Sequence, residues 1–140
     1  MITTPLTWPE NSPAIAAVLD DVCIDSGATE DVIGQNRCLE STNINRLTGP
    51  IACDTMGGNI NVECRGDCTY IDGLETKQGL MAPWSSMTLL SLTERLELGC
   101  KFYAEGAKAW LYNPISCKTV EFTNKEGLYK PNIESGANSD

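Results

Sequence analysis

The sequence of 140 residues contains no histidine. This absence excludes zinc sites with imidazole ligands and every nucleophile that depends on a Ser-His or Cys-His pair. No apolar run approaches the roughly 20 residues of a membrane span, and the first residues lack the basic and apolar segments of a signal peptide. We therefore expect an intracellular protein with no membrane partner.

The sequence also lacks any Cys-x-x-Cys pair, although its number of cysteines is high for its length. The seven are Cys23, Cys38, Cys53, Cys64, Cys68, Cys100 and Cys117. This spacing does not favour a four-cysteine metal site. We expect reduced, buried thiols in an intracellular protein, with no metal and no cofactor.

Positive charge is scarce. Ten Lys and Arg residues against 19 Asp and Glu residues give a net charge of −9. A nucleic-acid partner is not expected, because such proteins normally present a basic surface. Two copies of this chain repel one another, so salt or mild acid should favour their association. The length fits one domain within the usual range of roughly 50–250 residues.

The most informative stretch is residues 22–29, Val-Cys-Ile-Asp-Ser-Gly-Ala-Thr. The apolar run predicts a buried strand, and Ser26-Gly27 predicts a turn that ends it. Asp25 then lies at the rim of a core, where a carboxylate requires hydrogen bonds or a like partner. Gly27 allows a close backbone approach, and neighbouring hydroxyls can support the carboxylate. This arrangement suits an acid that shares a proton.

An apolar pair followed by Asp25-Ser26-Gly27-Ala28-Thr29 resembles the active-site loop of aspartic proteases, in the short retropepsin form of retroviruses and retrotransposons. The resemblance implies that Asp25 is catalytic, that Ser26 braces the paired carboxylates, that Gly27 offers its carbonyl to substrate and that Thr29 holds the loop. The chain has one such loop where a two-lobed protease needs two. Each chain would therefore supply half a site, and the active form would be a homodimer.

A Gly-Gly turn divides residues 51–64, and period-two alternation on one side of it predicts a β-hairpin. The preceding residues 38–50 are polar and are predicted to be irregular. In retropepsins a hairpin in this place is the flap that closes over substrate. The resemblance implies flap contacts with substrate from Thr55, Met56, Gly57, Gly58 and Asn59. A plain surface hairpin is the alternative.

Residues 88–99 predict a strand end followed by a short helix. Ser91-x-x-Glu94 is a capping box, and Gly99 is a natural C-terminal stop, so the helix should span about residues 92–98. Leu92 and Leu96 fall on one face of it. Val32, Leu89 and Leu90 are candidates for apolar subsite walls, and each is equally a candidate for the core.

The sequences of Met81-Ala82-Pro83 and of residues 89–92, Leu-Leu-Ser-Leu, resemble the corresponding segments in the protease of copia-type retrotransposons. The resemblance covers approximately residues 22–112. Two features differ from it. Retroviral retropepsins carry a Gly-Arg-Asn/Asp triplet before the helix, where this chain has Leu89-Leu90-Ser91, and the seven cysteines are unusual.

We predict a mainly all-β fold: a retropepsin-like closed β-barrel half-site with a flap hairpin and one short helix. Residues 14–130 would form the domain, residues 1–13 an extended arm and residues 131–140 a flexible tail. The expected function is an aspartic endopeptidase in the cytoplasm or in virus-like particles, acting on an extended peptide or a viral or retrotransposon polyprotein. Two alternatives are a domesticated, non-catalytic dimerisation or peptide-binding module, and a small acidic β-rich interaction protein unrelated to the family.

Overall fold

The computed structural model describes residues 17–55 and 58–133, which form mainly β-structure. The strands are β1 (Val22–Asp25), β2 (Val32–Ile33), β3 (Thr42–Thr55), β4 (Gly58–Ile71), β5 (Leu74–Met81), β6 (Thr88–Ser91), β7 (Lys101–Glu105), β8 (Lys108–Asn113), β9 (Lys118–Lys125) and β10 (Leu128–Pro131). The helices are α1 (Gln35–Cys38) and α2 (Leu92–Glu97). Neither helix is long and apolar enough to cross a membrane.

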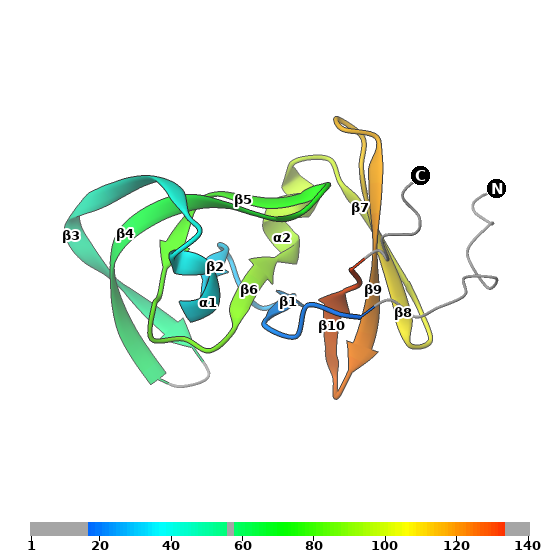
Figure 1. Cartoon of the computed structure of the whole chain (residues 1–140), viewed down its shortest axis with the longest axis horizontal. Coiled ribbons are helices and arrows are strands. Elements are labelled where there is room, and N and C mark those ends of the chain that lie inside the picture. Colours follow the sequence, from blue (N-terminus) through cyan, green and yellow to red (C-terminus); the bar gives the residue numbers. More distant parts are fainter. Residues whose placement is uncertain (1–16, 56–57, 134–140) are drawn as a thin grey trace.

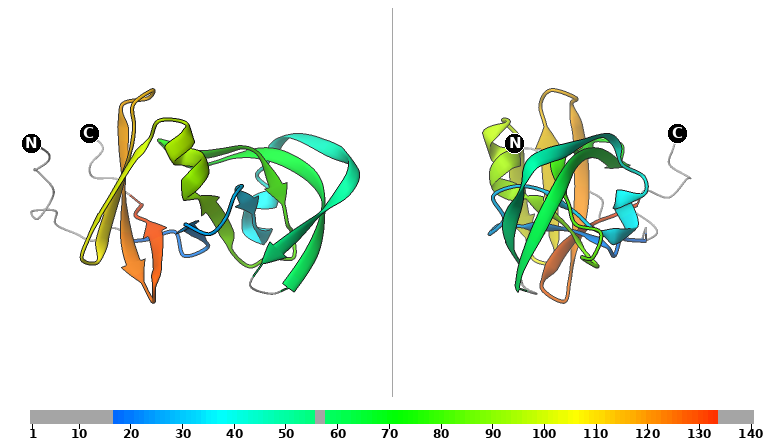
Figure 2. Two further views of the ribbon diagram at one scale, coloured as in Figure 1. Left: turned by 180° about the vertical axis from the view of Figure 1, so that it is seen from behind. Right: turned by 90° about the vertical axis from the view of Figure 1, so that its left-hand side faces the viewer.

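One sheet contains all ten strands, in the order β3-β4-β5-β2-β6-β1-β10-β9-β8-β7. The molecule is elongated, with β3–β5 and α1 at one end, β7–β10 at the other, and β1, β6 and α2 between them (Figure 1). Figure 2 shows the same arrangement from behind and along the molecule. β1 pairs in parallel with β6 and antiparallel with β10. The strand that ends at Asp25 therefore lies in the middle of the sheet.

The prediction of a mainly all-β fold is confirmed, but the prediction of a closed barrel is wrong. The strand order begins at β3 and ends at β7, so the described sheet has two open edges. After α2 the chain forms a meander in which β7, β8 and β9 each pair with the strand that follows, and β10 pairs with β9 and β1. This meander places β7 at an edge and does not return to β3.

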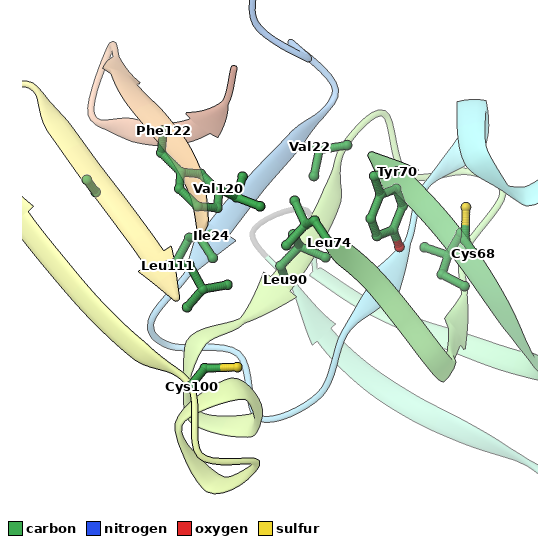
Figure 3. Packing of buried hydrophobic residues seen from close by; sticks show 12 residues of the cluster. Val22, Ile24, Cys68, Tyr70, Leu74, Leu90, Cys100, Leu111, Val120 and Phe122 are labelled. Atoms are coloured by element: carbon green, nitrogen blue, oxygen red, sulfur yellow. The ribbon is translucent and has the colours of Figure 1, made fainter. Parts of the chain in front are cut away.

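Two apolar clusters hold the sheet together. The larger one joins both ends of the molecule through buried side chains that include Val22, Leu90 and Phe122 (Figure 3). The smaller one lies under the β3–β4 hairpin and contains Val32, Val62, Leu80 and Ala82. Full burial of a large apolar side chain stabilises a fold by about 1.5–3 kcal/mol. The larger cluster therefore fixes β1 and β6 against the meander.

The polar composition of residues 38–50 predicted irregular structure, and this prediction is wrong. Residue 38 ends α1, residues 42–50 form the first part of β3, and most of residues 38–50 are exposed. Pairing with β4 and a polar cluster replace burial there. Asn43 Nδ2 and the backbone N–H of Gln78 each donate to the Asp67 carboxylate at 2.8 Å. These hydrogen bonds lower the pKa of Asp67 to about 2.

The predicted helix start and stop are confirmed for α2. Ser91 Oγ accepts a hydrogen bond from the Glu94 N–H at 3.0 Å, and Gly99 has a φ of +95°. The predicted apolar face is confirmed for Leu92, which packs against the larger cluster, but not for Leu96. Leu96 is 49% exposed, and the buried residue of the helix is Arg95.

The predicted C-terminal boundary also needs correction. Pro131 is buried in β10, and Asn132 forms an isolated bridge with Val18. Residues 131–133 therefore belong to the fold and not to a flexible tail. The remainder of the predicted tail and the arm at residues 1–13 lie outside the described residues.

Gly34 tests the packing between β2 and the loop before β6. A Cβ on Gly34 would lie 2.5 Å from the Met87 carbonyl oxygen, which is backbone that cannot rotate away. We expect Gly34→Ala to lower the free energy of unfolding by about 1–3 kcal/mol, measured by urea denaturation. Gly49→Ala is the matched control, because no atom lies within 4 Å of its Cβ position. Equal stability of the two variants would contradict the packing described here.

Candidate active-site loop

Asp25 lies where a buried strand meets a turn. The side chains of Val22, Cys23 and Ile24 are buried and Asp25 is half-buried, as the apolar run predicted. In the parallel pairing of β1 with β6, Asp25 is in register with Ser91. The carboxylate is thus placed at the end of a strand that is paired on both sides.

The loop after Asp25 folds back on that residue. The Gly27 N–H donates to Asp25 Oδ1 at 2.9 Å, and the Ala28 N–H donates to the Asp25 carbonyl at 3.2 Å. The hydroxyl that holds the loop is that of Ser91, whose Oγ donates to the Ala28 carbonyl at 2.8 Å. Thr29, which was expected to hold it, is exposed, as are Ser26 and Gly27. The tip of the loop therefore faces solvent.

A buried ion pair fixes the end of this loop. Arg95 Nη1 and Nη2 donate to Asp31 Oδ1 and Oδ2 at 2.6 and 2.7 Å. Asp31 is 2% exposed and Arg95 is 6% exposed. Burial acts to lower the pKa of Arg95, but the hydrogen bond and charge of Asp31 outweigh it, and the pKa is raised. Arg95 is thus held as a cation between the loop and α2.

Further donors complete the coordination of the Asp31 carboxylate. The Ser91 N–H donates to Oδ1 at 2.7 Å, and Thr76 Oγ1 donates to Oδ2 at 2.6 Å. Arg95 Nη2 also donates to the Glu75 carbonyl at 2.7 Å. The network therefore joins the Asp25 loop to β5, β6 and α2, and it satisfies the charge of a carboxylate that burial alone would destabilise.

Sequence reasoning missed both Asp31 and Arg95. One signal was present: Arg95 is the sole basic residue between Lys77 and Lys101. An isolated cation in an apolar stretch that forms a helix can face inward when a carboxylate is available to pair with it. Nothing in the spacing indicated that Asp31, six residues after Asp25, is that carboxylate.

The predicted flap region is a hairpin formed by β3 and β4. Its strands pair as far as Thr55 opposite Gly58, with Asn59 opposite Asp54. Met56 and Gly57 lie outside the described residues. The base of the hairpin is joined to the Asp25 loop, because Arg65 Nη1 donates to Glu30 Oε1 at 2.7 Å.

The three predicted subsite residues have different environments. Val32 and Leu90 are buried, and each belongs to one of the two apolar clusters. Leu89 is half-buried and packs against the smaller cluster. Val32 and Leu90 are thus core residues, and Leu89 is the one that a ligand could reach.

The cysteines offer no activated nucleophile near Asp25. Burial, with the Asp25 charge adding to it, raises the pKa of Cys23 to about 11. The six cysteines whose side chains are described are free thiols. Within residues 17–55 and 58–133, no group of three His, Cys, Asp or Glu side chains is placed to hold a metal ion. What the loop offers chemically is a carboxylate held by one backbone amide donor, the Gly27 N–H.

Comparison with protein-family models, with curated proteins and with solved structures gives no match for this chain. The features of the chain that bear on its function are therefore the geometry of the Asp25 loop and the resemblance of its residues.

Removing the cation of the buried pair should be costly, because it leaves the Asp31 charge without its partner. We expect Arg95→Leu to lower the free energy of unfolding by about 3–5 kcal/mol, measured from the urea midpoint. Arg46→Ala is the control: it removes an ion pair with Glu63 in which both side chains are exposed, so it should cost less than about 1 kcal/mol. A loss for Arg95→Leu as small as that of the control would show that the network does not support the loop.

Proposed function

We propose that this protein is an aspartic endopeptidase that is active as a homodimer, with Asp25 of each chain in a shared site. The observation that carries the proposal is the loop geometry: a carboxylate at the end of a buried strand, one oxygen bound by the Gly27 N–H, and an exposed tip. One such carboxylate is half of an acid–base pair. A second copy of the chain would supply the other half.

The residue at position 27 supports the proposal. A Cβ on Gly27 would lie 3.4 Å from Asp25 Oδ1, which is an ordinary contact distance. No contact with residues 17–55 or 58–133 therefore requires glycine there. A second chain or a peptide that approaches the loop backbone closely would require it.

Two Asp25 carboxylates at a two-fold axis would interact strongly. At about 4 Å and an effective dielectric of 20, repulsion between two full charges is on the order of 4 kcal/mol. A pair that shares one proton avoids this cost, and its titration then belongs to both groups together. The shared proton provides one acid and one base in the same site.

Those two roles are the ones that peptide hydrolysis needs. The ionised carboxylate takes a proton from a water held between the pair, and that water attacks the scissile carbonyl. The protonated carboxylate gives its proton to the carbonyl oxygen, so that a neutral tetrahedral diol forms. When the C–N bond breaks, the carboxyl that took the water proton gives it to the departing amine, and the other carboxylate takes a proton back from the diol, which restores the pair. The Gly27 N–H and the anchor at Ser91 keep the carboxylate oriented, and Cys23, as a neutral thiol, takes no part.

The substrate class that fits is a peptide in extended conformation. Such a peptide would lie between the β3–β4 hairpin and the Asp25 loop and would form strand-like hydrogen bonds with both. The Arg65–Glu30 ion pair joins these two elements, so closure of the hairpin over a peptide would act directly on the loop. A polyprotein that contains this domain is one such substrate.

The central test is substitution of Asp25. Incubated between pH 4 and 7 with unfolded casein, the protein should yield peptides that mass spectrometry identifies. Asp25→Asn should reduce the rate at least about 100-fold, because the pair loses its base. Asp72→Asn is the control, since that carboxylate is 80% exposed and pairs with Lys118. Circular dichroism should report the same fold for both variants, and full activity of Asp25→Asn would disprove the proposal.

A mixing experiment tests whether two chains share the site. A mixed dimer has one intact Asp25, so inactive Asp25→Asn chains should inhibit the wild-type chains that they pair with. With random pairing and a ninefold excess of the variant, cleavage per wild-type chain should fall to about one tenth. Unchanged cleavage per wild-type chain would indicate that each chain acts alone.

A further inference from the structure

The two edges of the sheet differ in how they would receive another strand. β3, at one edge, contains Pro50, and its pairing with β4 has register shifts between Thr42 and Asn45 and between Arg46 and Ile51. Proline and irregular pairing are devices by which proteins protect an edge from other chains. β7, at the other edge, has neither. It pairs with β8 residue for residue, from Lys101 opposite Tyr112 to Glu105 opposite Lys108.

The β7 edge also exposes a large aromatic side chain at its centre. Tyr103 is 59% exposed. Its ring is stacked on Trp110 of β8, with centroids 5.5 Å apart and an angle of 27° between the planes. The stack ends at the sheet edge, where a further strand would continue it. Figure 1 shows β7 at the end of the molecule opposite the hairpin.

The five residues of β7, Lys-Phe-Tyr-Ala-Glu, are complementary to themselves when read in reverse. In an antiparallel pair centred on Tyr103, Lys101 lies opposite Glu105 of the partner subunit, and Glu105 lies opposite the partner's Lys101. Tyr103 lies opposite its own copy. Opposite charges and aromatic pairs are the cross-strand contacts that stabilise antiparallel sheets, whereas like charges destabilise them.

We propose that β7 pairs antiparallel with β7 of a second copy of this chain, so that one sheet continues through both subunits. The contact is two-fold symmetric, which makes each cross-strand ion pair occur twice. It also joins the two Tyr103–Trp110 stacks into a ladder of four rings. The partner is a second copy because β7 itself carries both charges of each cross-strand ion pair, Lys101 and Glu105, and the central aromatic ring, Tyr103.

This contact does not rest on the proposed function, because strand pairing at β7 needs no catalytic Asp25. β7 follows α2, and α2 begins beside Ser91, whose hydroxyl holds the Asp25 loop. In the sheet, β10, β9 and β8 separate β7 from β1, which ends at Asp25, so a two-fold axis at β7 is a different axis from one that would pair two Asp25 carboxylates. β10, the last strand described, is already flanked by β1 and β9, so the described chain ends in a strand that has no free edge to offer a partner.

Exchange of the two charges tests the contact. Lys101→Glu places Glu opposite Glu twice, and Glu105→Lys places Lys opposite Lys twice. We expect each to raise the dimer dissociation constant about tenfold, and the double variant Lys101→Glu/Glu105→Lys to restore it. Residues 101 and 105 of one chain are about 13 Å apart along the strand, so restoration requires the second chain.

The measurement is sedimentation velocity of the full chain over a range of concentrations, with circular dichroism of each variant. Lys77→Glu is the control for net charge, since Lys77 is exposed on β5, away from the edges, and it should leave the dissociation constant near the wild-type value. A wild-type chain that stays monomeric, or a double variant no tighter than the single ones, overturns the proposal.

Parallel cleavage assays separate this inference from the proposed function. If dimerisation follows the charge exchange but Asp25→Asn cleaves casein as well as the wild type does, the β7 contact stands and the enzymatic proposal fails. If cleavage depends on Asp25 while substitutions at residues 101 and 105 leave the dissociation constant unchanged, the enzymatic proposal stands and the β7 contact is wrong.

Discussion

The buried ion pair between Asp31 and Arg95 is the interaction on which the rest of the structure depends. It joins the end of the Asp25 loop to α2 and to β5 by hydrogen bonds of 2.6–2.7 Å. An apolar pair of similar volume could fill the same space, often with equal or greater stability. A carboxylate and a guanidinium, however, accept few relative orientations. The pair therefore selects one position of the loop relative to the helix, which general apolar packing would not do.

The two ends of the molecule are held by different forces. The meander packs on the larger apolar cluster through Leu111, Val120 and Phe122. The start of the β3–β4 hairpin relies instead on the polar cluster around Asp67 and on strand pairing, with most of its side chains exposed. Segments with few buried apolar contacts open locally at lower free energy than the core does. The hairpin end is thus the part of the sheet that can open while β1 and β6 stay in place.

Local chemistry made part of this fold predictable from the sequence. The strand before Asp25, the turn at Ser26-Gly27, the cap at Ser91 and the stop at Gly99 each depend on a few neighbouring residues, and each is present in the structure. The failures share another cause. The first half of β3 is a strand without burial, and Arg95 is buried by a partner 64 residues away. Patterns of apolar residues do not report structure that is stabilised by distant polar contacts. The closed barrel was expected from the family resemblance, and the strand order from β3 to β7 does not close.

The position of β10 has a consequence for synthesis of the protein. β1 carries Asp25 and needs β10 as its second neighbour, and the register places Ile24 opposite Tyr129, a separation of 129 − 24 = 105 residues. In a nascent chain β1 emerges from the ribosome before β10 does. β1 therefore lacks this neighbour until the meander has been translated. Contacts of such sequence separation form slowly, because a long loop must close first. The strand that carries Asp25 therefore reaches its final setting only after β10 has been translated, so a polypeptide that lacks β10 cannot complete the sheet around β1.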